Sequence, residues 1–188
     1  EYVYCIEAIL QKKYPELMER GRIDQAVVSS VVPEITDRVT KAAEYICGKK
    51  PFSITSGIKT GFGIKLKNNE QLGADIVCNS AAAVSLMNAA GAAVVLDMGT
   101  ATTLTVINEN KNVIGVVITP GVSVSLNALT DSAALLQNVR LENEKILLGR
   151  NTDEAINSGI INGMRIMLDG FVREIREQYG KNGLSLIA

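Results

Sequence analysis

The segment that decides the fold is residues 94–106, VVLDMGTATTLTV. Its apolar start at residues 94–96 predicts a buried strand, and residues 102–107 predict the hairpin partner of that strand. Gly99 lies between the two and permits a tight turn in which backbone N–H groups converge on one point. The segment therefore predicts a β-hairpin with a carboxylate, Asp97, at its turn.

Two interpretations of this turn stay open. In the first, the hydroxyls of Thr100, Thr102 and Thr103 suit a phosphate oxygen, and Asp97 suits Mg²⁺ or an attacking group. In the second, the hairpin is an ordinary one and Asp97 caps its own turn. The segment alone does not decide between them.

The composition is that of a globular α/β protein and argues against several partners. The 188 residues are 47% hydrophobic and 21% charged, with a formal net charge of −1. Lys and Arg are dispersed, so the charge pattern excludes an electrostatic footprint for nucleic acid. No apolar run reaches membrane-spanning length, and the start is not a signal peptide. We therefore expect a cytoplasmic protein with neither membrane nor nucleic-acid partners.

The chain contains no histidine, which limits the chemistry that it can perform. Ser-His-Asp and Cys-His nucleophiles are excluded, and a zinc site is disfavoured. Cys5, Cys47 and Cys78 are far apart and lack CxxC spacing, so we expect reduced, mostly buried thiols, with Cys78 inert. Proton transfer must then depend on Asp, Glu, Lys, Tyr or Cys.

Hydrophobic periodicity predicts helices that alternate with strands. The predicted helices cover residues 4–18 (broken at Pro15), 33–46, 70–90, 122–129 with a short continuation at 132–136, and 152–179 with Thr152 as its cap. The predicted strands cover residues 25–32, 52–55, 113–119, 145–148 and 184–188, besides the hairpin. This pattern predicts an α/β fold with a mixed sheet and a possible boundary near residue 90.

Two sets of small residues each allow two interpretations. Gly115 and Pro120-Gly121 are either sheet and turn punctuation or backbone shaped around a ligand. Gly159 and Gly163 lie one turn apart in the last helix, where each costs about 1 kcal/mol relative to Ala. They indicate close approach of another backbone, within the fold or across a dimer.

Asp75 lies in the first turn of a predicted helix, two residues after Gly73. A carboxylate there stabilises the helix dipole, which alone explains its presence. Alternatively, Gly73 lets a substrate approach and Asp75 accepts a hydroxyl proton.

Five segments occur in an order and spacing that resembles the type III pantothenate kinases, also known as the Bvg accessory factor family. These segments are SSVVP at 29–33, GAD at 73–75, DMGTATT at 97–103, the stretch from Gly115 to Gly121, and GRNT at 149–152 with Ser158-Gly159. Together they span nearly the whole chain.

The resemblance implies an acetate-kinase/Hsp70/actin-like (ribonuclease H-like) ATPase fold with two related α/β halves. Residues 1–90 would be the remainder of the first half, and residues 91–188 the second. It also implies a homodimer that transfers the ATP γ-phosphate to pantothenate, the first step towards coenzyme A. The cofactors it implies are Mg²⁺ and a monovalent cation, K⁺ or NH₄⁺.

The resemblance also assigns site residues. It makes Asp75 the general base and Asp97 a metal ligand. It places Asp97, Gly99, Thr100 and Thr102 at the ATP phosphates, and Gly73, Ala74 and Ser132, with its neighbour Ala133, at pantothenate.

The sequence departs from the family pattern in several places. The Asp-x-Gly-Asn-Thr phosphate loop and the Thr-Gly-Gly segment are absent, so we expect a central fragment with little activity of its own. Ile76 stands where many members carry an Arg, and Thr105 stands where they carry an Asp. Asn69, Val116 and Gln137 depart as well. The alternative hypothesis is therefore a non-catalytic, dimeric binding or regulatory member of the family.

Overall fold

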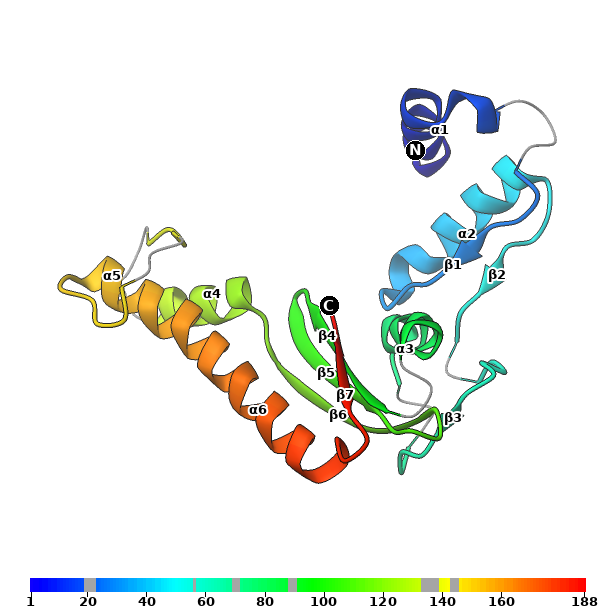
Figure 1. Cartoon of the computed structure of the whole chain (residues 1–188). Helices are drawn as coiled ribbons and strands as arrows, with labels where there is room; N and C mark the ends of the chain where they lie inside the picture. The colour runs from blue at the N-terminus through cyan, green and yellow to red at the C-terminus, as the bar shows by residue number, and fades with distance from the viewer. Residues whose placement is uncertain (19–22, 56, 69–71, 88–90, 133–138, 143–145) are drawn as a thin grey trace. The chain divides into compact units, whose positions relative to one another are not determined.

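The structure is a computed structural model, shown in Figure 1. It describes residues 1–18, 23–55, 57–68, 72–87, 91–132, 139–142 and 146–188. The chain divides into two compact units, the first made of residues 1–61 and 67–82, the second of residues 62–66 and 83–188. The predicted boundary near residue 90 lies outside the described residues.

The first unit is mainly helical. Its helix α1 (Tyr2–Lys13) ends before Pro15, as predicted, and a short 3₁₀ helix (Pro15–Met18) follows. Helix α2 (Pro33–Cys47) begins with its proline at the first helical position, where no N–H is needed. Strands β1 (Val27–Val28) and β2 (Phe52–Ser53) pair in parallel beside it.

The predicted buried strand at residues 25–32 is wrong in length and in burial. Only Val27 and Val28 pair with another strand, and Val27 is 64% exposed. Ser30 explains the early end, because its Oγ accepts hydrogen bonds from the N–H of Val32 at 3.3 Å and from the hydroxyl of Thr36 at 2.7 Å. This local bonding competes with strand pairing and leads the chain into α2.

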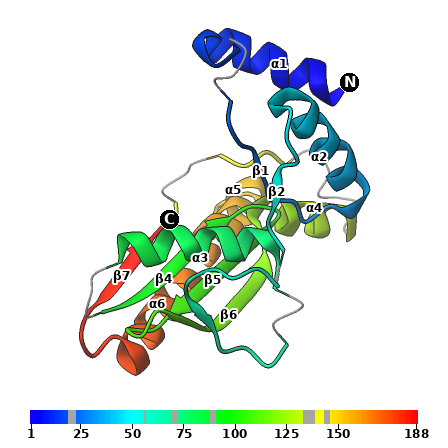
Figure 2. The ribbon, with the colours of Figure 1, turned by 90° about the vertical axis from the view of Figure 1, so that its right-hand side faces the viewer.

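The second unit is built on a five-stranded mixed sheet in the order β3-β6-β5-β4-β7. Figure 2 shows β6, β5, β4 and β7 side by side. Its strands are β3 (Gly63–Ile64), β4 (Ala92–Met98), β5 (Ala101–Ile107), β6 (Asn112–Pro120) and β7 (Leu184–Ile187). Strands β4, β5 and β6 are antiparallel neighbours, whereas β7 runs parallel to β4 and β3 parallel to β6. The predicted hairpin, third strand and terminal strand are confirmed.

Both faces of this sheet carry a core. On one face Ala93, Val95 and Ile107 pack against Ala83 and Met87, at the end of α3 (Ala74–Leu86) and just beyond it.

On the opposite face, Val94, Leu104 and Val106 pack against Leu168 and Ile175 of helix α6 (Gly163–Tyr179). Burial on both faces explains why the first half of β4 is continuously apolar rather than alternating. The predicted α/β class, with a mixed sheet flanked by helices, is confirmed.

The predicted single helix at 152–179 is interrupted. Helix α5 (Thr152–Asn157) passes through a π-helical turn (Ser158–Asn162) into α6. The cap is Asn151 rather than Thr152, since the Asn151 side chain accepts a hydrogen bond from the N–H of Glu154 at 2.9 Å.

Residues 146–148 form no strand, contrary to the prediction for 145–148, of which residue 145 lies outside the described residues. Instead, side chains of the π-helical turn donate hydrogen bonds to the backbone carbonyls of residues 146 and 147. The Ser158 hydroxyl donates to Leu147 O at 2.6 Å, and the Asn162 amide donates to Ile146 O at 3.0 Å. Side-chain donors therefore take the place of a neighbouring strand.

Gly159 and Gly163 have open space around them. A Cβ added at either residue would meet no described atom within 4 Å. Close backbone approach within the fold is therefore wrong for the described residues. The alternative, contact across a dimer, stays a prediction.

Helix α4 (Val122–Ser132) confirms the predicted helix after Pro120-Gly121, and its predicted continuation lies outside the described residues from 133 on. None of the helices in the described ranges combines the length and apolar character needed to cross a bilayer.

The prediction that the three cysteines are mostly buried is wrong. Cys5 is exposed, and Cys47 and Cys78 are only half-buried.

Replacement of Leu104 by Ala tests the α6 face of the sheet. Leu104 is fully buried between the sheet and α6, so we expect Leu104→Ala to lower the free energy of unfolding by about 2–5 kcal/mol. Urea denaturation measures the loss, with Leu129→Ala on exposed α4 as the control. Equal small losses in the two variants would contradict this packing.

Candidate functional site

The β4–β5 turn is held by two backbone hydrogen bonds. The N–H of Gly99 donates to Ala101 O at 3.0 Å, and Thr100 O accepts from the N–H of Gly121 at 2.9 Å. Gly99 and Thr100 are exposed, while Asp97 is half-buried at the end of β4. The turn is therefore fixed in shape and open to solvent.

The fold itself does not require glycine at position 99. Its φ is not in the left-handed region, so our expectation that the turn uses the conformational freedom of Gly99 is wrong. A Cβ at Gly99 would meet only Ala101 O, at an ordinary 3.7 Å. The missing side chain instead leaves the exposed backbone of the turn accessible to a ligand.

Strand register places Asp97 beside Thr103. The two residues are direct partners across β4 and β5 and therefore share a face of the sheet. Directly opposed Cβ atoms lie about 4.5–5.5 Å apart, so the carboxylate and the hydroxyl are neighbours. Thr103 is 8% exposed. The structure thus places an acidic group and a hydroxyl next to each other, just below the open turn.

Thr102 lies on the opposite face, which argues against the expectation that it reaches a phosphate. It pairs with Met98, is fully buried, and its hydroxyl has no hydrogen-bond partner among the described residues. Residues 99–101 lie between the paired Met98 and Thr102, so the residue on Asp97's face is Thr103. A turn with only two unpaired residues would instead have put Thr102 opposite Asp97, so the sequence alone did not distinguish the two threonines.

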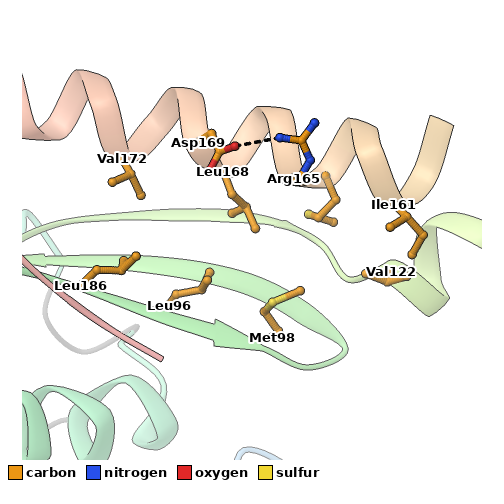
Figure 3. Close-up of a pocket in the computed structure, with 10 residues that line it drawn as sticks. Leu96, Met98, Val122, Ile161, Arg165, Leu168, Asp169, Val172 and Leu186 are labelled. Carbon is orange, nitrogen blue, oxygen red and sulfur yellow. Dashed lines mark hydrogen bonds and ion pairs between the residues drawn. The ribbon is translucent and has the colours of Figure 1, made fainter. Parts of the chain in front are cut away.

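A cavity of about 330 Å³ opens between the sheet and α6 on the face of Thr102 (Figure 3). Leu96 and Met98 line it from β4, and Leu168 and Val172 line it from α6. Its lining is almost entirely apolar, and its charged residues, Arg165 and Asp169, pair with each other at 3.1 Å. Such a cavity offers nothing to a phosphate, so we place the candidate site at the turn.

Asp75 belongs to the first unit and is oriented by the start of α3. Its Oδ1 accepts a hydrogen bond from the N–H of Ile76 at 2.8 Å. The carboxylate lies over Gly73, where an added Cβ would collide with Oδ1 and lie 3.6 Å from Val31 Cγ1. Gly73 therefore makes room for the Asp75 carboxylate, a role that the sequence did not reveal.

Of the residues predicted to contact the substrate, Ala74 and Ser132 are poorly placed to bind it. Ala74 is buried, and the hydroxyl of Ser132 donates to Ala128 O of its own helix at 2.7 Å. Ala133, the neighbour of Ser132, lies outside the described residues. The assignment of Gly73, Ala74 and Ser132 to a substrate stays a prediction.

The surroundings of Asp97 suit a Mg²⁺ ion that the protein binds through one carboxylate, rather than a metal ion held entirely by protein side chains. Across the described ranges, no three Cys, Asp or Glu residues gather closely enough to hold a metal ion. Mg²⁺ commonly takes one or two carboxylates and completes its shell with water and substrate phosphates. A single carboxylate at an open turn is compatible with that mode.

The structure gives less support to a binding site for a monovalent cation. Thr105, which stands where the resembled family carries an Asp, offers an uncharged hydroxyl and is only 2% exposed. We therefore assign no residue of this chain to K⁺ or NH₄⁺.

Comparisons with known sequences agree on one family. The sequence model described as type III pantothenate kinase matches residues 6–174. The type III pantothenate kinase of Dictyoglomus turgidum is 39% identical over 178 residues, which cover 94% of this chain and 68% of that protein. That of Bacillus cytotoxicus is 35% identical over 178 residues, or 95% of this chain and 66% of that protein. The chain thus spans about two thirds of the length of these relatives.

A solved structure shares the fold. The crystal structure of a protein described as a Baf family transcriptional activator, from Campylobacter jejuni, superimposes with a TM-score of 0.53 at 17% identity. The match covers 88% of this chain and 68% of that one. At this identity the likeness concerns the fold alone.

Substitution of Thr102 tests its unpartnered hydroxyl. Since that hydroxyl makes no hydrogen bond with the described residues, Thr102→Val should leave the free energy of unfolding unchanged or raise it by up to about 1 kcal/mol. Thr102→Ser, which keeps the hydroxyl and removes the buried methyl, should lower it by about 1 kcal/mol. Chemical denaturation of both variants gives the comparison, and the reverse order of stability would mean that the hydroxyl is bonded.

Proposed function

This chain belongs to the type III pantothenate kinase family, and we propose that it carries out that family's reaction on pantothenate. In that reaction the γ-phosphate of ATP is transferred to the primary hydroxyl of pantothenate, which gives 4′-phosphopantothenate and ADP. This reaction is the first step of coenzyme A biosynthesis. One observation supports this proposal most directly: Asp97 and Thr103 share a face at the open Gly99–Thr100 turn.

The turn is proposed to hold the phosphates. Phosphoryl transfer depends on positioning and on neutralisation of charge more than on covalent chemistry by the protein. The exposed backbone at Gly99 and Thr100 and the hydroxyl of Thr103 are suited to contact phosphate oxygens. Asp97 would hold Mg²⁺, which neutralises charge on the phosphates when bound.

Asp75 is the proposed proton acceptor. The bond from the N–H of Ile76 fixes the orientation of its carboxylate, and the side chain remains half-exposed. As the pantothenate oxygen bonds to the γ-phosphorus, Asp75 takes the hydroxyl proton and ADP leaves with the electrons of the broken bond.

The family supports further proposals for this chain. We propose a cytoplasmic homodimer that uses ATP, Mg²⁺ and a monovalent cation. Gly73, Ala74 and Ser132 are the proposed contacts to pantothenate.

A second candidate function rests on two buried positions. Ile76 is 7% exposed and Thr105 is 2% exposed, where the family pattern described above has an Arg and an Asp. A member with these replacements could bind nucleotide without phosphorylating pantothenate.

A coupled assay of ADP release separates the two candidates. The protein expressed from its full reading frame is assayed with MgATP, with and without pantothenate. The kinase proposal expects turnover that depends on pantothenate. Binding of ATP with no such turnover would favour the non-catalytic function instead.

Asp75→Asn tests the proton acceptor. The amide cannot accept the proton, so we expect turnover to fall by about 10²-fold or more while ATP affinity stays unchanged. Asp37→Asn, on the exposed side of α2, is the matched control and should retain full turnover. Normal turnover in Asp75→Asn would reject this role.

Thr103→Val tests which threonine faces the phosphates. Loss of one hydrogen bond to a charged group should raise the KM for ATP by about 10-fold. Thr102→Val, on the other face, should leave that KM unchanged if the register argument holds. Steady-state kinetics with varied ATP decides, and the opposite pattern would restore Thr102 to the site.

A further inference from the structure

Gly121 joins the candidate phosphate turn to a helix. It is buried between the end of β6 and the start of α4. Its N–H donates to Thr100 O at 2.9 Å, and its carbonyl accepts from the N–H of Ser125 at 2.9 Å, the first hydrogen bond of α4. One residue thus bonds to the turn through its donor and to the helix through its acceptor.

The contact leaves no space for a side chain at Gly121. An added Cβ would overlap the carbonyl oxygen of Gly99 and lie 2.7 Å from that of Thr100. Both neighbours are backbone atoms, so no change of rotamer could relieve the overlap. The φ of Gly121 is not left-handed, and the requirement for glycine is therefore one of contact, not of backbone conformation.

We propose that Gly121 is a positioning residue of the phosphate site. Its bare Cα lets the carbonyls of Gly99 and Thr100 pack against it, and this contact fixes where the exposed side of the turn points. The inference rests on the proposed function, because it concerns the same site. For Gly121, the proposal favours backbone that shapes the site over plain sheet and turn punctuation.

Gly115, which lies on β6, provides a matched comparison. A Cβ added there would meet nothing within 4 Å, and its φ is not left-handed. Gly115→Ala and Gly121→Ala therefore add the same methyl group to β6 and to the residue just after it, with different steric consequences.

The experiment compares these two variants of the full-length protein in the ADP-release assay. A displacement of about 1 Å at a reacting group can cost 10²-fold, so we expect Gly121→Ala to lower kcat/KM for ATP by about 10- to 100-fold. The KM for pantothenate should stay within about two-fold, and Gly115→Ala should match the wild type. A merely structural role would lower the thermal midpoint without this selective loss. Equal ATP kinetics in the two variants would overturn the proposal.

Two further measurements keep the test decisive. If Gly121→Ala does not fold, Thr100→Gly and Thr100→Ala are compared, since Gly loosens the turn backbone and Ala does not. The proposal then expects the larger loss of ATP affinity in Thr100→Gly, and equal losses would overturn it.

If the wild type shows no turnover with pantothenate, the proposed function fails. Gly121 is then judged by MgATP affinity measured by calorimetry. Weaker binding in Gly121→Ala than in Gly115→Ala supports the positioning role. Equal affinities, or no binding by the wild type, overturn it.

Discussion

The pairing of β4 with β5 is the constraint on which the candidate site depends. Because Asp97 pairs with Thr103 and Met98 with Thr102, each side chain of the hairpin is committed to one face of the sheet. One set of side chains completes the core against α6, and the other brings the carboxylate and the Thr103 hydroxyl together. A shift of one residue would exchange the two sets, so packing of the core fixes the site.

The same hairpin shows how a stable core and an open turn coexist. Val94, Leu104 and Val106 are almost completely buried, while Gly99 and Thr100, at its end, are exposed. The turn does not depend on burial for its shape, since hydrogen bonds with Ala101 and Gly121 hold it. A rigid support under an exposed backbone is what a phosphate-binding turn needs.

The sequence predicted the hairpin, the α/β class and the family correctly, because these depend on apolar runs and on local motifs. It failed where side chains bond to distant backbone. Nothing local shows that Ser158 bonds to Leu147 O, which is why a strand was predicted there. Nor could the sequence tell whether Thr102 or Thr103 lies beside Asp97, because register across a turn depends on the number of residues that the turn leaves unpaired.

The central claim is that phosphates and their metal ion bind at the Gly99–Thr100 turn, on the face of Asp97. An NMR titration with MgATP tests it most directly, because chemical shifts change mainly for nuclei close to the bound ligand. We predict that the amide signals of Gly99 and Thr100 shift, while the methyl signals of Leu168 and Ile175 on the α6 face stay in place. Shifts confined to the α6 face, or none at the turn, would contradict the claim.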